Sequence, residues 1–154
     1  LGEPVNIFLK DQDITDLVRT EKIAEKTSAL SSLKEIRDFV RPHQRKFKKP
    51  PGLIADGRDM GTVIFPEADL KIFLIASLEE RAKRRQSQLK RQGSKVNMPL
   101  LLEELEARDR KDIERELSPL LPAEDSYEID TTGLSPEEVL NKIRSLSSDF
   151  RFGA

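Results

Sequence analysis

The sequence predicts an α/β fold, because short apolar strands alternate along it with segments of helical periodicity. Three segments carry the strand pattern: residues 53–56 (LIAD), 70–76 (LKIFLIA) and 126–130 (SYEID). The first two are continuously apolar, which is typical of strands buried on both faces of a parallel sheet. Helical segments separate the strands, as crossover connections between parallel strands require.

The composition excludes several kinds of site. The chain has 154 residues, of which 36% are hydrophobic, and its 27 basic and 28 acidic residues nearly balance. A net charge of -1 favours neither nucleic acid nor an anionic membrane as a partner. With no cysteine and a single histidine, His43, disulfides, thiolate catalysis and a histidine-rich metal site are excluded. Because the apolar runs are short and cysteine is absent, we expect a cytoplasmic protein.

The N-terminal third predicts a hairpin followed by two helices. Residues 5–10 (VNIFLK) are rich in strand formers and the turn residues of DQD follow them, so we expect a small antiparallel hairpin. A helix is expected over residues 21–30. A second helix is expected to start at Ser32, in a capping box with Glu35, and to end or kink at Pro42.

Three further helices are predicted by their start and stop signals. A serine or asparagine at the N-cap supplies an acceptor for the first free amides, and glycine or proline marks an end or a first position. These signals are Ser77 with Glu80 and Gly93 for the first helix, Asn97 with Pro99 for the second, which is expected to run to about Leu117, and Ser135 with Pro136 for the third.

The segment after the first predicted strand, DGRDMGT at residues 56–62, is either a ligand site or a glycine turn. Asp56 would lie at the carboxyl edge of the sheet, where open α/β folds bind ligands, and the two glycines would let a ligand approach the backbone. Arg58 suits a phosphate, and Asp59 suits an amino donor on a base or hydrated magnesium. A turn with a solvated ion pair explains the same residues. A P-loop is excluded here, because TVIFP follows instead of Gly-Lys-Ser/Thr and a helix.

A second group of charged residues lies in ARDRKDIEREL. Arg108, Asp112 and Arg115 fall at positions i, i+4 and i+7, so on a helix all three can face one way. Two arginines with a carboxylate between them can hold an anionic, hydroxylated ligand such as a nucleotide. A surface helix with ion pairs is the alternative interpretation.

The stretch over residues 81–95 contains seven basic residues and no acidic one. After a strand and a capped helix start, such a stretch suits a mobile lid that brings arginine to phosphates. A solvated face or a weak nucleic-acid patch are the alternatives. The absence of aromatic residues within the stretch argues against base stacking on single strands.

Together these blocks resemble the bacterial cytidylate kinase family over essentially the whole chain: GLIADGRDMGTVIFPEADLKIFLIASLEERAKRR, RDRKDIER, SPLLPAEDSYEIDTTGLSPEEV and LVRTEKIAEKTSALSSLKEIR. The resemblance implies the P-loop nucleoside monophosphate kinase fold: a parallel sheet flanked by helices, with a small antiparallel β insert and a helical lid. It assigns residues 1–50 to the nucleotide-binding insert, 51–78 and 119–154 to the α/β core, and 79–118 to the lid and the following helix.

The resemblance also implies transfer of the γ-phosphoryl group of ATP to CMP or dCMP, a step of pyrimidine nucleotide metabolism. On the acceptor side, Ser28 and Arg37 would contact the nucleotide, Arg58 its phosphate and Asp59 the cytosine amino group. The pentose and its surroundings would be held by Arg108, Asp112 and Arg115.

On the donor side, the resemblance places Arg81, Arg84 and Arg85 in the lid that approaches ATP. Asp56 would orient magnesium through water, with no side chain bound to the metal directly. The implied catalytic residues are therefore Arg58, Asp56, Arg84 and Arg85.

The family pattern starts with a strand, a P-loop and a helix, and no counterpart precedes Leu1. We therefore expect the isolated chain to bind ATP poorly, to be marginally stable or to self-associate, whereas the full-length protein would be a monomer. Partners other than CMP or dCMP and ATP, such as nucleic acid or a membrane, are not expected. Two alternatives stay open: a non-catalytic nucleotide-binding fragment, and a nucleic-acid-binding module built on the basic stretch.

Overall fold

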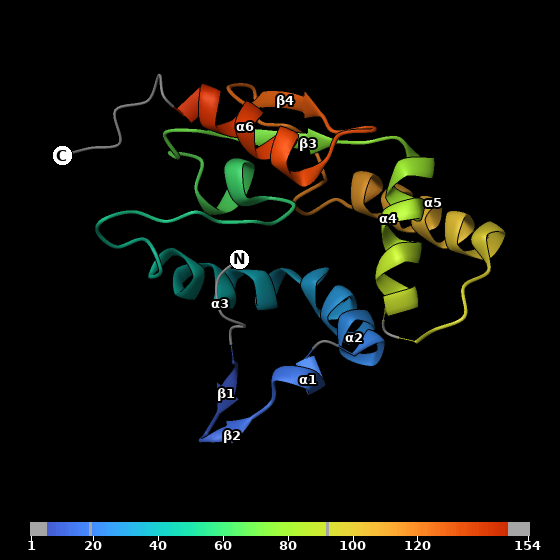
Figure 1. Cartoon of the computed structure of the whole chain (residues 1–154). Helices are drawn as coiled ribbons and strands as arrows, with labels where there is room; N and C mark the ends of the chain where they lie inside the picture. The colour runs from blue at the N-terminus through green and yellow to red at the C-terminus, as the bar shows by residue number, and fades with distance from the viewer. Residues whose placement is uncertain (1–5, 19, 92, 148–154) are drawn as a thin grey trace. The chain divides into compact units, whose positions relative to one another are not determined.

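The computed structural model describes residues 6–18, 20–91 and 93–147 and divides the chain into two compact units (Figure 1). The first unit is Leu1–Lys49 and the second is Pro50–Ala154. Within the described residues, no helix combines the length and the apolar character that crossing a membrane requires.

The first unit begins with the predicted hairpin. Strands β1 (Phe8–Leu9) and β2 (Gln12–Asp13) pair in antiparallel register. Lys10 and Asp11 connect them with φ values of 49° and 65°, the left-handed pair that a two-residue hairpin turn needs. A short helix, α1 (Thr15–Val18), follows directly, so the strand pattern ends sooner than the apolar residues of this region indicate.

Two helices complete the first unit: α2 (Glu21–Ser31) and α3 (Lys34–Arg45). The capping box predicted at Ser32 is wrong, since its hydroxyl donates to the carbonyl of Ala29 at 2.7 Å and no side chain caps α3. The carbonyls at the end of α2 have no helical partners and compete for the same hydroxyl. Helix α3 also continues beyond Pro42 to Arg45, so this proline does not end the helix, although it has no amide hydrogen to donate.

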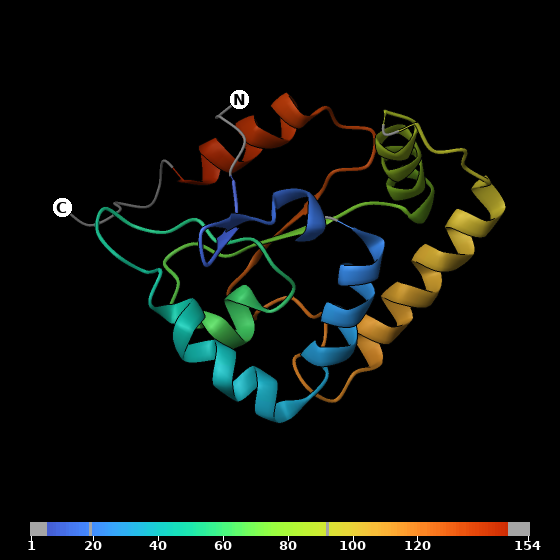
Figure 2. The same ribbon diagram turned by 90° about the horizontal axis from the view of Figure 1, so that it is seen from below.

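The second unit contains a parallel pair of strands. Strand β3 (Ile72–Ile75) pairs with β4 (Tyr127–Asp130), from Ile72 opposite Tyr127 to Ile75 opposite Asp130. These are the second and third strands that the sequence predicts. In both ribbon views helix α6 (Pro136–Ser147) lies on one side of the pair (Figures 1 and 2).

The first predicted strand is wrong. Residues 53–56 form no strand, Leu53 is exposed and Ile54 is completely so, at 101% of its reference area. An extended segment becomes a strand only when a neighbour accepts and donates its backbone hydrogen bonds. Among the described residues, strand pairing in this unit is confined to β3 and β4. The apolar pattern of LIAD is thus present without the partner that would make it a strand.

The three predicted helices of this unit are confirmed: α4 (Leu78–Arg91), α5 (Met98–Glu114) and α6. The amide of Glu80 donates to Ser77 Oγ at 3.2 Å, and Asn97 caps α5 with its side-chain oxygen. Ser135 forms a capping box with the residue three positions on, with hydrogen bonds in both directions. Gly93, at φ 78°, follows α4 as the predicted stop.

The described core of the second unit is small. Helices α4 and α5 pack against each other, and each contributes one buried apolar side chain. An ion pair between Arg81 and Asp109, 2.7 Å long, also joins the two helices. The buried apolar residues are Ile64, Phe65, Ala82, Leu101 and Ile129.

A lysine ties the turn after the DGRDMGT segment to the loop before β4. The side chain of Lys71 is 8% exposed, and its Nζ donates to the carbonyl of Pro66 at 2.6 Å and to both carboxylate oxygens of Asp125 at 2.9 and 2.8 Å. The stem of Lys71 packs on Gly61 in the turn η1 (Met60–Ile64), where a Cβ would meet its Cδ at 3.3 Å. The ammonium therefore needs Asp125, because a buried charge without a partner is costly.

We expect Asp125→Asn to lower the thermal unfolding midpoint in a pH-dependent way. The hydrogen bonds from Lys71 lower the pKa of the Asp125 carboxyl below its ordinary value. The contribution to stability is therefore present above the ordinary carboxyl pKa of about 3.9 and is lost as the pH falls through the lower, folded value. Unfolding followed by circular dichroism should separate the variant from the parent at about pH 7 and bring them together toward about pH 2. Glu124→Gln, at an exposed neighbour, is the control, and parallel curves for all three proteins would contradict the prediction.

Candidate functional site

Three of the predicted site residues meet at one carboxylate of the second unit. Arg58 Nε lies 2.6 Å from Asp112 Oδ2, and a terminal nitrogen of Arg115 lies 3.7 Å from Asp112 Oδ1. The Asp112 side chain is 14% exposed and that of Arg58 is 40% exposed. The contact at Oδ2 is an ion pair without the alignment of a hydrogen bond. This cluster of Arg58, Asp112 and Arg115 is called the arginine–aspartate cluster below.

The local chain course fixes two members of the cluster. Asp112 lies in the last turn of α5, and its carbonyl accepts from the amide of Leu120 at 2.8 Å. Arg115 is the C-cap, with an extended ψ of 137°, and its Nε donates to the carbonyl of Ser118 at 2.5 Å. The sequence places Arg115 on the helical face of Asp112, whereas the structure brings it there from just beyond the helix.

Arg58 keeps donors available for a ligand. Within the described part of the chain, its guanidinium makes no hydrogen bond, and the ion pair to Asp112 involves Nε. The terminal nitrogens are the donors that match phosphate in a fork geometry. Arg58 is thus held by a carboxylate at one side while part of its side chain remains exposed.

Asp59, next to Arg58, is buried. It is 8% exposed and precedes η1, a π-helical turn, where its carbonyl accepts from the amides of Val63 at 2.9 Å and Ile64 at 3.1 Å. Such π turns often occur at functional positions of proteins. Asp56 is exposed and follows an irregular segment, so the prediction that a buried strand delivers it to the sheet edge is wrong.

The glycines of DGRDMGT are explained by neighbouring side chains. A Cβ on Gly57 would meet the Met60 side chain at 2.8 Å, and one on Gly61 would meet the stem of Lys71 at 3.3 Å. Neither glycine has the left-handed φ of Gly52, at 152°. The structure therefore gives Gly61 a packing role, whereas at Gly57 the nearest atom is the flexible end of the Met60 side chain, which can move aside.

Three residues that are predicted to contact the acceptor nucleotide are not part of this cluster. Arg108 is exposed on α5 and has neither hydrogen bond nor ion pair among the described residues. Ser28 lies in α2 and Arg37 in α3, both in the first unit. The side chain of Ser28 lies outside the described residues, and a terminal nitrogen of Arg37 donates to the carbonyl of Ser31 at 3.2 Å.

The predicted lid arginines are engaged within the second unit. Arg81 pairs with Asp109 and donates from Nε to the carbonyl of Ala76 at 3.2 Å. Arg85 donates to Gln88 of its own helix at 3.0 Å. Arg84 reaches Glu80 and the turn after β4, as described below.

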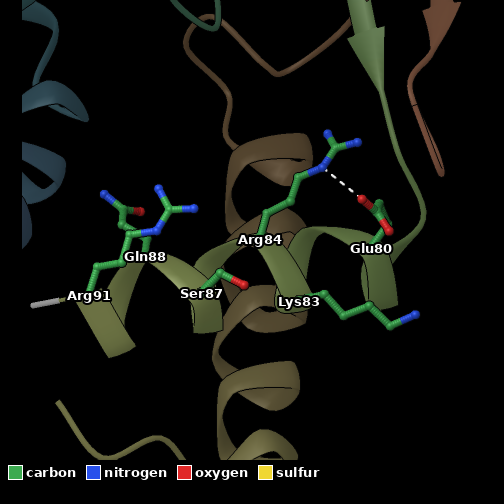
Figure 3. Close-up of a pocket in the computed structure, with 6 residues that line it drawn as sticks. All are labelled: Glu80, Lys83, Arg84, Ser87, Gln88 and Arg91. Carbon is green, nitrogen blue, oxygen red and sulfur yellow. Dashed lines mark hydrogen bonds and ion pairs between the residues drawn. The ribbon is translucent and has the colours of Figure 1, made fainter. Parts of the chain in front are cut away.

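A shallow hollow of about 430 Å³ lies along α4. Its lining side chains, drawn in Figure 3, all come from that helix. A second hollow, of about 450 Å³, lies between η1 and the loop before β4. Neither hollow is lined by Arg58, Asp59 or Asp112. The arginine–aspartate cluster is therefore recognised by its charges and contacts, and cavity size does not locate it.

Comparison with known proteins identifies the family of this chain. The sequence model of the cytidylate kinase family matches residues 2–148. The chain belongs to the cytidylate kinase family. This confirms the resemblance that the sequence blocks indicate, and membership implies the nucleoside monophosphate kinase fold.

Similar proteins include several curated cytidylate kinases. Those of Pseudomonas putida KT2440 and Pseudomonas fluorescens SBW25 are 49% and 50% identical over 144 residues, which cover 94% of this chain. That of Stutzerimonas stutzeri A1501 is 48% identical over 148 residues, or 96% of this chain. The match spans 63% of the length of the two Pseudomonas enzymes and 65% of the Stutzerimonas enzyme.

Two residues that the sequence did not single out hold the predicted lid arginines. Asp109 pairs with Arg81, and Thr131 accepts hydrogen bonds from Arg84. Asp109 lies within the charged helix that the sequence singles out, one helical turn before Asp112, and this spacing could have indicated it. Thr131 follows a strand, and no spacing rule connects it with an arginine 47 positions earlier.

We expect Asp112→Asn to destabilise the second unit by about 2 kcal/mol, because two arginines lose a mostly buried counter-charge. The partial exposure of Arg58 keeps this below the cost of breaking a fully buried pair. Urea unfolding of Asp112→Asn, Arg58→Met and the double variant measures the coupling, and the double variant should lose less than the sum. Glu106→Gln, an exposed position of α5, is the control. Additive losses would show that Arg58 and Asp112 do not act as a pair.

Proposed function

We propose that this chain is the acceptor-binding and lid part of an ATP-dependent cytidylate kinase, which transfers the γ-phosphoryl group of ATP to CMP or dCMP. The observation that carries the proposal is the arginine–aspartate cluster in a chain of this family. Arg58 and Asp112 come from separate blocks, both blocks carry acceptor contacts by resemblance, and their side chains lie 2.6 Å apart. The names of the relatives support the same activity.

In this proposal the cluster holds the nucleotide from two sides. The terminal nitrogens of Arg58 bind the phosphate of CMP, and Arg108 and Asp112 hold the pentose hydroxyls with Arg115 nearby. The Asp112 carboxylate has acceptor capacity for a hydroxyl, since its Oδ1 lies 3.7 Å from Arg115, beyond hydrogen-bond distance. Binding of a phosphate would also neutralise the positive charge that Asp112 only partly balances.

Base choice rests with Asp59 in the same proposal. A carboxylate accepts from the exocyclic amino group of cytosine, whereas the carbonyl that uracil carries at this position would face it with a like partial charge. Ser28 and Arg37 of the first unit complete the acceptor contacts, with Arg37 near the base.

The finer architecture belongs to the proposal as well. Residues 1–50 form the nucleotide-binding insert, 51–78 and 119–154 the α/β core, and 79–118 the lid and the helix after it. The parallel pairing of β3 with β4 and the basic character of α4 support this division. In the whole enzyme the sheet would be parallel and flanked by helices.

Magnesium would arrive with ATP. Among the described residues, no three carboxylate, histidine or cysteine side chains gather as metal ligands. Magnesium commonly binds through one or two carboxylates, waters and substrate phosphates, so the single exposed carboxylate of Asp56 fits a water-mediated contact. When bound, the metal would supply positive charge to the phosphate oxygens.

The residues of this chain would act by placing and neutralising groups. Phosphoryl transfer needs the acceptor oxygen in line with the γ-phosphorus and positive charge around the equatorial oxygens. Arg58 would fix the acceptor phosphate, and the cluster would fix the sugar, so that the attacking oxygen is oriented before ATP binds. Arginines of the lid would add charge when it closes and excludes water.

A coupled ATP-consumption assay with CMP, dCMP and UMP tests the proposed function. It should be run on the chain printed here and on the product of its whole gene, with calorimetric titration of the three nucleotides alongside. Turnover that prefers the cytosine nucleotides supports the kinase. Nucleotide binding without turnover by either protein would support the non-catalytic alternative, and strong, salt-dependent affinity for RNA without nucleotide binding would support the third.

Variants of the two neighbouring residues separate base choice from phosphate binding. Asp59→Asn replaces an acceptor-only carboxylate by an amide that can also donate to the uracil carbonyl, so it should reduce the preference for CMP over UMP by about tenfold or more. Arg58→Ala should weaken the binding of both monophosphates alike, by roughly tenfold to a hundredfold. Calorimetric titration with CMP and UMP measures both effects, and equal changes from the two variants would refute the division of roles.

A further inference from the structure

The guanidinium of Arg84 makes four hydrogen bonds to protein acceptors, while 43% of its side chain is exposed. Its Nε donates to Glu80 Oε1 at 2.9 Å on the preceding turn of α4 (Figure 3). Its terminal nitrogens donate to Thr131 Oγ1 at 3.1 Å, to the Thr131 carbonyl at 2.6 Å and to the Leu134 carbonyl at 3.5 Å. Arginine carries five N–H groups, so four acceptors from two elements leave little capacity for another anion.

The turn that Arg84 contacts is itself bound to the end of β3. The buried Thr131 donates from its amide and its hydroxyl to the carbonyl of Ile75, at 2.8 and 2.9 Å. The amide of Ser77 donates to Thr132 Oγ1 at 2.9 Å. The end of the β3–β4 pair, the start of α4 and the turn after β4 thus form one hydrogen-bonded junction, and Arg84 links the second turn of α4 to it.

A second arginine holds the same part of α4 from another side. Arg81 donates to the carbonyl of Ala76 and pairs with Asp109 of α5. In the same stretch of α4, Ala82 is completely buried, at 0% exposure. The first two turns of α4, called its base below, are therefore attached to the end of β3, to the turn after β4 and to α5.

We propose that Arg84 is a positioning residue that fastens the base of α4 to the junction, and that any hinge of the lid lies beyond Arg84. This inference rests on the proposed function, in which α4 belongs to the lid. To bind a phosphate of ATP, Arg84 would have to exchange several protein acceptors for one ligand. The movable part of α4 then begins after Arg84, and the arginines that follow it are the ones that can travel toward ATP.

Amide hydrogen exchange on the chain tests the fastening without any substrate. Arg84→Ala should speed exchange at the amides of Thr131 and Leu134 by roughly tenfold or more, because both lie in the turn that it holds. Exchange at Leu101, in the first turn of α5, should stay unchanged. Lys83→Ala is the matched control, since Lys83 is an exposed cation on the same helix whose side chain points away from the Arg84 guanidinium (Figure 3).

A second pair of variants keeps the test valid if Arg84→Ala folds poorly. Arg84→Lys retains the charge but cannot reach all four acceptors, so it should give an intermediate increase in exchange. Thr131→Val removes, with little change in shape, the hydroxyl that accepts from Arg84 and donates to Ile75, and in the Arg84→Lys background it should add less than it does alone. Unchanged exchange at Leu134 in all the Arg84 variants would overturn the proposal.

The kinetic arm uses the product of the whole gene. Arg84→Lys should lower kcat by about tenfold while the KM values for ATP and CMP stay within about threefold, because a displaced lid misaligns both substrates after they bind. A large rise in the KM for ATP with normal exchange at Thr131 would instead assign Arg84 to a phosphate. If exchange responds as expected but no cytidylate kinase activity is found, the fastening stands and the proposed function fails.

Discussion

The structure of the second unit has to place positive charge beside the Asp112 carboxylate. A mostly buried carboxylate without a counter-charge costs several kcal/mol, so the fold has to bring cations to it. Arg115 comes from the chain just after α5, and Arg58 comes from the segment before η1. The ion pair that neutralises Asp112 therefore also holds Arg58 in position before a ligand binds. Pre-placement reduces the entropy that a ligand would otherwise have to offset when it orders a long side chain.

Arg58 and Arg84 show two uses of the same side chain. Arg58 has one ion pair through Nε, no hydrogen bond within the described residues, and a side chain that is 40% exposed. Arg84 is exposed to a similar extent, 43%, but it has four acceptors that join helix to turn. A guanidinium can serve as a ligand group only while donors remain, and otherwise it acts as a rigid connector. The number of engaged donors therefore separates residues that the sequence places in one basic class.

Local signals predicted much of the fold, and long-range contacts account for the misses. The caps at Ser77 and Ser135 were predictable because a cap involves residues within one turn. The capping box at Ser32 failed since two helix ends compete for one hydroxyl. The segment 53–56 has a strand pattern without a described strand partner. For the site, residue types and resemblance indicated Arg58 and Asp112 separately, but nothing local links residues so far apart in sequence.

In the proposed function, the burial of Asp59 bears on how base choice would arise. At an exposed carboxylate, water replaces a missing donor and the difference between two bases is small. Asp59 is 8% exposed and anchors the π turn through its carbonyl, so its position is fixed and water has little access. Under the proposed function, a base that fails to donate would bring a carbonyl toward this carboxylate in a poorly solvated place, which costs more than the loss of one hydrogen bond in water. Discrimination by such a residue therefore depends on the turn that buries it as much as on its charge.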